Sequence, residues 1–299
     1  MEPSRGTLVL TAGSLGDSLM TLPALHFLQT KAPVTIAGTF PYQALGNEML
    51  GVDQVVPLEP LLQSLLTPGN WEPSVRDFLN GFSDIYLFFK DLDSSLEQKL
   101  STLSQVRLHY PSQSFSDFLQ EARWAGEYWL QTVMPSPLPS DPHLRQARLK
   151  ISPELSLKSL DLLKNLGLTK PLVIHPGSGS PKKNAPLSFF RDAAQRAVTE
   201  SNKQVLVTWG EAEERDLENI RQAFSGLRGV KVLDKSLDLR TLAGVLSVSA
   251  AYLGNDSGVT QLASACGLKT FAVFHGTDSR IWGPLANTLI YHWVNENLA

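Results

Sequence analysis

Three observations predict an α/β protein built from two Rossmann-like halves. Short apolar runs, which are typical of buried strands, alternate along the 299 residues with longer segments of helical periodicity. Four prolines between residues 134 and 142 interrupt this series once, near its middle, and the same alternation then resumes. Because strands alternating with helices form βαβ units, we expect a parallel sheet in each half.

In the first half, strands are expected over residues 7–11, 34–37, 54–57, 84–89 and 106–109. Helices are expected over residues 17–30, 115–133 and near 41–50, 72–81 and 94–102. Pro23 falls in the first turns of the helix over 17–30, where a helix tolerates proline better than in its middle. The proline-rich residues 134–142 cannot form a helix or a central strand, so we predict a linker or an extended surface crossing. We divide the chain into residues 1–150 and 151–299.

In the second half, the expected strands are residues 172–175, 204–208, 231–233, 250–253 and 270–274. The expected helices are residues 153–166, 188–200, 211–224, 239–247 and 259–266, the last of them closed by Gly267 at its C-cap. The cleft between two such halves is the default place for a ligand.

Composition excludes several classes of function. Hydrophobic residues make up 42% of the chain and the net charge is −3, so there is no overall basic surface for nucleic acid. The single cysteine excludes an internal disulfide and paired-cysteine metal sites, which fits a reducing cytoplasm. No apolar run reaches the ~18 residues of a membrane span, so we expect a cytoplasmic protein, with a peripheral membrane contact still open.

Charge divides unevenly between the halves. Residues 1–150 hold 10 Lys and Arg against 15 Asp and Glu, whereas the remainder holds 16 against 14. If the halves are separate domains, the second is the better place for an anionic ligand.

Polar loops follow two neighbouring strands near the end of the chain. Asp256, Ser257 and Gly258 come at a strand's carboxyl end, with Gln261 one turn into the next helix, and residues 275–278 follow the next strand. Ligands of open α/β sheets bind at this edge, where helix N-termini direct free N–H groups outward. Asp and Ser are also ordinary N-caps, so capping remains an alternative.

Two further loops stand in equivalent places. Gly13, Ser14, Gly16 and Asp17 join the first strand to its helix, and Asp17 is either a cap or a carboxylate general base. In the second half, Ser178, Gly179, Ser180 and two lysines follow a strand and form a plausible phosphate cradle. A surface loop with solvated lysines is the alternative. Neither loop has the spacing of the dinucleotide fingerprint or of the Walker A motif.

Two acidic segments are weaker candidates. Asp91 and Asp93 form a DxD pattern, which can bind a metal diphosphate, but Asp93 also suits a helix N-cap. Glu213 and Glu214 lie in a first helical turn, where acidic residues suit the helix dipole, or they hold ribose hydroxyls. No His and Cys cluster has zinc spacing.

Together these loops resemble glycosyltransferase family 9, the ADP-heptose:lipopolysaccharide heptosyltransferases. GDSLMTLPAL (residues 16–25) resembles the family's GD…TxPAL signature, and HPGSGSPKKNAP (175–186) resembles its HPGSGSxxKxWP segment. NDSGVTQLASACG (255–267) with GTDSRIWGP (276–284) resembles its block NDSGxxHxAxAxG…GxTxxxxxGP. The matches occur in order across nearly the whole chain.

The resemblance implies a GT-B fold, with two Rossmann-like domains facing a central cleft, the first on the acceptor side and the second binding the nucleotide sugar. It implies inverting, metal-independent transfer in which the nucleotide sugar is a co-substrate and the acceptor is a glycan or glycolipid. The family's base corresponds to Asp17 and its phosphate-contacting lysine to Lys183. Its sugar-contacting residues correspond to Asp256, Ser257 and Gly258, and its nucleoside-contacting acid to Glu213 or Glu214.

Three departures concern the substrates more than the fold. The family's helical His is Gln261, its Trp in the lysine loop is Ala185, and the long C-terminal tail is absent or shortened. An acidic first half also fits poorly with a phosphorylated acceptor. A non-catalytic nucleotide-sugar-binding protein and, more remotely, a GT-B epimerase are therefore alternatives to the transferase.

Overall fold

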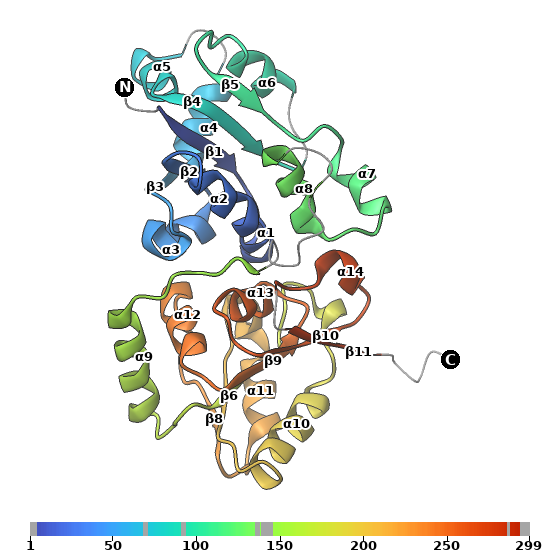
Figure 1. The fold of residues 1–299 in the computed structure, drawn as a ribbon. Helices are drawn as coiled ribbons and strands as arrows, with labels where there is room; N and C mark the ends of the chain where they lie inside the picture. Colours follow the sequence, from blue (N-terminus) through green and yellow to red (C-terminus); the bar gives the residue numbers. More distant parts are fainter. Residues whose placement is uncertain are drawn as a thin grey trace. The chain divides into compact units, whose positions relative to one another are not determined.

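The computed structural model describes residues 5–67, 71–90, 94–134, 138, 146–285 and 288–293. The chain divides into two compact units, Met1–Ala147 and Arg148–Ala299. Each unit contains one parallel sheet, with helices between successive strands (Figure 1). The proline-rich residues and the Asp91/Asp93 pattern lie almost entirely outside the described residues.

The first unit holds a five-stranded sheet in the order β3-β2-β1-β4-β5. Its strands are β1 (Gly6–Thr11), β2 (Val34–Gly38), β3 (Gln54–Pro57), β4 (Phe82–Phe88) and β5 (Arg107–His109). Its helices are α1 (Leu15–Met20), α2 (Leu22–Gln29), α3 (Phe40–Leu50), α4 (Leu58–Leu66), α5 (Pro73–Asn80), α6 (Ser94–Leu100), α7 (Phe115–Gln120) and α8 (Ala125–Val133).

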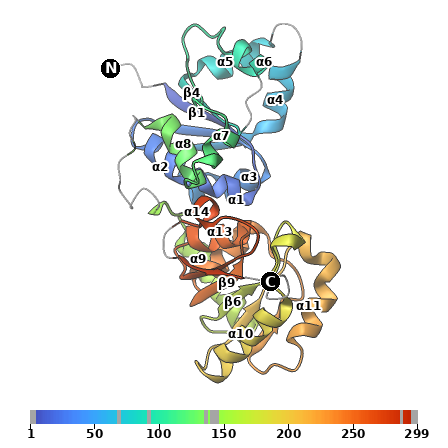
Figure 2. The same ribbon diagram turned by 90° about the vertical axis from the view of Figure 1, so that its right-hand side faces the viewer.

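Alternate residues of the central strands face opposite layers, as the period of a strand requires. Leu8, Leu10, Ile85 and Leu87 are fully buried in a core shared with α4, α5 and α6. The alternate residues of these strands face the opposite layer, formed by α2 and α8, which pack side by side (Figure 2). There the centre of the Phe88 ring lies 5.2 Å from that of Trp129 on α8. Burial on both faces explains why these strands read as continuous apolar runs.

The second unit holds a six-stranded parallel sheet in the order β11-β10-β9-β6-β7-β8. Its strands are β6 (Leu172–His175), β7 (Val205–Val207), β8 (Val230–Val232), β9 (Ala251–Asn255), β10 (Thr270–Phe274) and β11 (Thr288–His292). Its helices are α9 (Pro153–Asn165), α10 (Leu187–Thr199), α11 (Leu217–Phe224), α12 (Leu239–Ser247), α13 (Gly258–Ala265) and α14 (Ser279–Trp282), with 3₁₀ turns at Pro181–Lys183 and Glu211–Asp216. Counted along the chain from β6, this is the doubly wound order 3-2-1-4-5-6.

Several predicted elements need correction. The single helix expected over 17–30 is two helices broken at Thr21, and the one expected over 115–133 is broken where Ala122 adopts a positive φ of 51°. The first part of the helix expected over 211–224 is 3₁₀. Helices α4 and α14 and strand β11 were not predicted. Among the described helices, none is both long and apolar enough to cross a membrane.

Candidate active-site residues

In the first unit, the predicted loop lies at the carboxyl end of β1, as expected. Ser14, not Asp17, is the N-cap of α1, and Asp17 is the third residue of the helix. The Ser14 backbone N–H and hydroxyl both donate to Oδ2 of Asp17, at 3.2 and 2.9 Å. A Cβ on Gly13 would lie 2.8 Å from Cβ of Asp17, so a larger residue there would displace the carboxylate. Gly16 is half-buried inside α1.

Lys90 is the partner of Asp17 that the sequence did not reveal. It follows β4, the strand beside β1, and its Nζ lies 2.7 Å from Oδ1 of Asp17. The Lys90 ammonium also lies 5.0 Å from the centre of the Phe115 ring, which fixes the direction of the long side chain. The signal that could have found Lys90 is its position directly after a buried strand next to β1.

In the second unit, the centre of the arrangement is Asp256, which lies at the carboxyl end of β9 and is 6% exposed. Lys183 Nζ donates to Oδ2 of Asp256 at 3.0 Å, and the Thr277 hydroxyl donates to the same oxygen at 2.8 Å. These groups come from the loops that follow β6, β9 and β10, three adjacent strands. The structure therefore brings Lys183 and Asp256 together.

Asn255 connects the lysine loop to β9. Its side chain is fully buried, with Nδ2 donating to the Pro176 carbonyl at 2.6 Å and Oδ1 accepting from the Ala185 N–H at 3.0 Å. Within the loop, the Ser178 hydroxyl lies 2.8 Å from the Ser180 carbonyl and 2.7 Å from Oδ1 of Asn184. These bonds hold both ends of the segment that carries Lys183. Gly179 is exposed.

The two candidate glutamates lie in different environments. Glu213 is buried, and its Oε2 accepts from the Gly210 N–H at 2.8 Å, whereas Glu214 is exposed. A Cβ on Gly177 would overlap the Glu213 side chain, so the carboxylate packs directly against the loop backbone. Burial raises the pKa of Glu213. Of the two, Glu213 is the one that the fold holds beside the lysine loop.

His175 ends β6 beneath this loop. Its Nε2 lies 3.5 Å from Oε2 of Glu213, and its Nδ1 lies 3.2 Å from the Thr208 hydroxyl. Burial lowers the pKa of His175 to about 4, so the ring is neutral at pH 7. The motif resemblance included His175, but a histidine in the sequence does not by itself indicate a neutral ring that contacts Glu213 and Thr208.

Helix α13 begins at Gly258, with Ser257 as its N-cap accepting from the Thr260 N–H at 3.3 Å. Gln261 is 3% exposed, and its Nε2 donates to the Trp282 carbonyl at 2.8 Å. Its Oε1 is buried without a hydrogen-bond partner among the described residues. At the helix's other end, burial raises the pKa of the Cys266 thiol to about 12.

No group of three His, Cys, Asp or Glu side chains within the described ranges has a geometry that could hold a metal ion. The candidate residues offer a carboxylate with a nearby ammonium in each unit. An ammonium at the carboxyl end of a strand, beside a loop and a helix N-terminus, can bind an anionic group. A buried carboxylate with hydroxyl neighbours can accept hydrogen bonds from sugar hydroxyls.

The comparisons with known proteins bear on the family and the fold. The family model described as glycosyltransferase family 9 (heptosyltransferase) matches residues 138–299. A putative glycosyltransferase of Haemophilus influenzae is 27% identical over 130 residues, 42% of this chain and 37% of that protein. Lipopolysaccharide heptosyltransferase 1 of Pseudomonas aeruginosa is 29% identical over 120 residues, 40% of this chain and 33% of that protein. The chain thus matches about a third of the length of these curated relatives.

Solved structures match nearly the whole chain. Heptosyltransferase II of E. coli superposes with a TM-score of 0.76 at 15% identity, covering 97% of this chain and 91% of that one. A family 9 glycosyltransferase of Veillonella parvula gives 0.72 at 15% identity, covering 99% and 89%. These similarities, with the two parallel sheets, confirm the predicted α/β fold class with two Rossmann-like domains of the GT-B type. Since the family model covers more than half of the residues, the chain belongs to glycosyltransferase family 9.

Proposed function

We propose that this chain is an inverting, metal-independent glycosyltransferase. It moves a heptose-like sugar from a nucleotide diphosphate donor such as ADP-heptose to a lipopolysaccharide-core or other glycan acceptor. The observation that supports this best is that Lys183 and Thr277 both donate hydrogen bonds to Asp256, at the carboxyl ends of three adjacent strands. The names of the relatives, which include a lipopolysaccharide heptosyltransferase, support the donor and acceptor classes.

The second unit would hold the donor. The hydrogen bonds that Asp256 accepts from Lys183 and Thr277 both go to Oδ2, so Oδ1 is the oxygen with capacity for a sugar hydroxyl. Lys183 keeps two of its three N–H donors for the diphosphate, together with the backbone N–H groups of residues 178–180. Glu213, rather than the exposed Glu214, would face the nucleoside, and Gln261 would support the α13 end of the site.

The first unit would supply the base. Oδ2 of Asp17 already accepts two hydrogen bonds from Ser14, whereas Oδ1 accepts one from Lys90. Oδ1 therefore has a lone pair for the proton of an acceptor hydroxyl. As that oxygen forms its bond to the anomeric carbon, the bond to the diphosphate breaks, the proton passes to Asp17 and Lys183 stabilises the leaving charge. Attack opposite the leaving group inverts the anomeric configuration.

The remaining predicted partners follow from the same chemistry. The protein would need no cofactor beyond the donor co-substrate and would bind no nucleic acid. We expect the protein to act in the cytoplasm, and a glycolipid acceptor would bring it to the inner face of the membrane.

The test is a panel of nucleotide sugars and glycan acceptors, read by product formation and by donor binding. Asp17→Asn should bind the donor as tightly as the wild type but lose turnover by about 100-fold or more, the scale of a lost general base. The chain offers a matched control in Asp117, the third residue of α7, whose Oδ2 accepts from the N-cap Ser114 hydroxyl at 2.7 Å. Asp117→Asn should keep full activity.

Each outcome separates the alternatives. Equal turnover of Asp17→Asn and wild type would refute the base assignment. Donor binding by the wild type without transfer to any acceptor would instead favour the non-catalytic nucleotide-sugar-binding protein, for which the uncharged Gln261 is the supporting observation.

A further inference from the structure

A cavity lies in the first unit, at the edge of the sheet opposite Asp17. It measures about 490 Å³ and is lined by residues at the start of β1 and β4, on β5, and at the ends of α2 and α8. With six residues in β1 and a rise of ~3.3 Å per residue, this amino edge is about 17 Å from the carboxyl edge where Asp17 lies. The cavity is therefore separate from the residues assigned to transfer.

The cavity concentrates positive charge in an acidic unit. Residues 1–147 contain eight Lys and Arg against fifteen Asp and Glu. Three of the eight, Arg5, Lys31 and Arg107, line this one cavity, together with a single carboxylate, Asp84. The lining of this cavity therefore carries a net positive charge within a unit whose net charge is negative.

Asp84 is not available to a ligand. Its Oδ1 accepts from Nε of Arg107 and lies 2.8 Å from Nε2 of His109, and its Oδ2 accepts from Nη2 of Arg107 and from the Ser83 hydroxyl. These four contacts use all the acceptor positions of a carboxylate. The same contacts lower the pKa of Asp84 to about 2, against the effect of burial, so it stays ionised and paired with Arg107.

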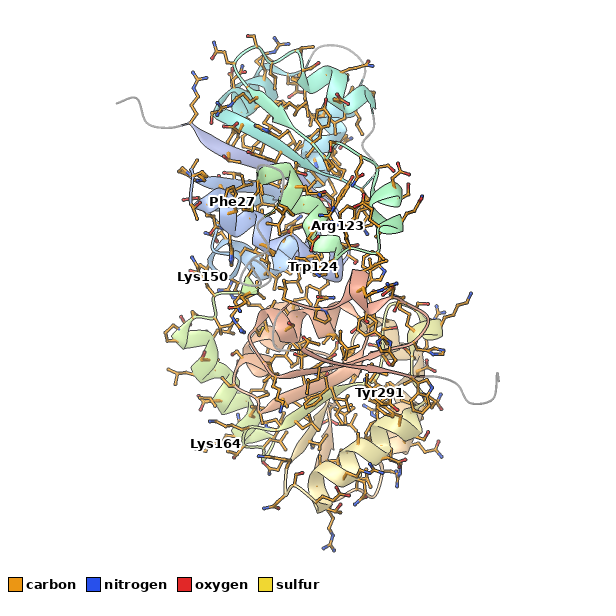
Figure 3. All side chains as sticks on the ribbon, turned by 45° about the vertical axis from the view of Figure 1, so that its right-hand side comes forward. Phe27, Arg123, Trp124, Lys150, Lys164 and Tyr291 are labelled. Atoms are coloured by element: carbon orange, nitrogen blue, oxygen red, sulfur yellow. The ribbon has the colours of Figure 1, made fainter. Side chains whose placement is uncertain are left out.

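Arg5 and Lys31 have no such counter-charge among the residues that the structure describes. Nη1 of Arg5 donates to the neutral Gln105 amide oxygen at 2.9 Å, and Lys31 Nζ lies 5.2 Å from the centre of the Phe27 ring. Phe27, labelled in Figure 3, lies on α2, and with Leu28 and Tyr86 it provides apolar walls for the cavity. The cavity thus combines two uncompensated cations with a surface for an uncharged organic group.

We propose that this cavity is a binding site for a phosphate ester. Phosphate suits it better than a single carboxylate because its two negative charges match Arg5 and Lys31, and a guanidinium offers paired donors in the geometry of phosphate oxygens. The apolar walls hold the group that the phosphate esterifies. The phosphate monoester comes either from a soluble sugar phosphate or from a lipid that ends in a phosphate monoester, such as phosphatidic acid, and the chemistry at the cavity is the same for both. This proposal does not depend on the transferase activity.

The experiment compares three forms of the full chain. The first is wild type, the second is Arg5→Gln with Lys31→Gln, and the third is Lys164→Gln with Arg196→Gln. The third pair makes the same charge change on exposed positions of α9 and α10 in the second unit. All four positions are exposed, and equal melting temperatures will verify that each variant is folded.

Calorimetry with glucose 1-phosphate, and with glucose as the uncharged control, tests the soluble source. Flotation with vesicles of phosphatidic acid in phosphatidylcholine, and with phosphatidylcholine alone, tests the lipid source. We expect the cavity variant to lose at least tenfold in affinity for one of the two phosphate probes while the second-unit variant matches wild type. The probe affected identifies the source. If wild type binds neither probe, if the cavity variant binds both like wild type, or if both variants lose binding equally, the proposal is wrong.

Discussion

A methyl group added at Gly177 should selectively disrupt the Glu213 position, and Gly179→Ala provides the matched control. A Cβ on Gly177 would lie 2.0 Å from Oε1 of Glu213, 2.2 Å from its Cδ and 2.3 Å from its Cγ. Three atoms of one buried side chain stand in the way, so Glu213 must leave its place as a whole. A Cβ on Gly179 meets nothing within 4 Å.

The expected cost has two parts. Overfilling a packed region costs ~1–3 kcal/mol, and moving Glu213 removes its 2.8 Å bond from the Gly210 N–H, a bond to a charged group worth ~1.5–3 kcal/mol. Neither Gly177 nor Gly179 has a positive φ, so Ala fits the backbone at both and gains ~0.4–1 kcal/mol through the unfolded chain. That gain cancels in the comparison, which leaves Gly177→Ala less stable than Gly179→Ala by about 2.5–6 kcal/mol.

The assay is urea unfolding of both variants and wild type at pH 7.5, followed by circular dichroism. Donor binding is measured in parallel, because Gly177→Ala should weaken it if Glu213 faces the nucleoside. The reasoning is wrong if the free energies of unfolding of the two variants differ by less than about 0.5 kcal/mol. Surface substitutions ordinarily change stability by amounts of about this size.

Three further results are expected. Asn255→Ala should lower the free energy of unfolding by about 2–4 kcal/mol, because the buried Pro176 carbonyl and Ala185 N–H lose their hydrogen-bond partner. The control, Asn219→Ala at an exposed helical site, should change it by less than about 0.5 kcal/mol in the same urea titration. Lys183→Met should weaken ADP binding in calorimetry by about tenfold or more, since a bond to a charged group is worth ~1.5–3 kcal/mol, whereas the exposed Lys182→Met should match wild type. The pKa of His175 is about 4 in the folded chain and near 6.5 when unfolded, so the unfolded state takes up its proton first as the pH falls. Stability should therefore drop by about 2 kcal/mol between pH 7.5 and 5, and a wild type that loses no more stability than His175→Gln over this range would contradict the assignment.

Most strands could be predicted because burial on both faces makes them continuous apolar runs. The missed elements lack that signal. Strand β11 pairs with β10 alone and exposes Leu289, Ile290 and Tyr291. Its extended structure therefore depends on backbone pairing with β10 and not on burial of its side chains. Helix α4 contains Pro60, a residue that normally argues against a helix but is tolerated here in the first turn.

The helix breaks depend on local geometry that residue types do not specify. At Thr21 the hydroxyl donates to the Ser18 carbonyl at 2.7 Å, and Pro23 lacks the N–H that would continue the first helix. Ala122 takes a positive φ, which is uncommon outside glycine and asparagine, so no sequence pattern indicates it.

The sequence predicted which loops carry the candidate site residues, but not which of their side chains contact one another. Position after a strand placed Asp17, Lys183 and Asp256 at carboxyl edges, because all strands of each sheet are parallel. Which side chains meet there depends on the strand order, and the order was not available from the sequence. The pairing of Lys90 with Asp17 follows from β4 lying beside β1, although the two strands are separated by seventy residues or more.

The state of Cys266 has a practical consequence. A thiol whose pKa is about 12 is almost wholly protonated at neutral pH, and only the thiolate reacts with maleimide dyes. The natural chain is thus chemically silent toward such labels and has no other thiol. Cysteines introduced at one exposed position in each unit would accept fluorophores without any background, so that energy transfer between them could follow movement of the units while a donor binds.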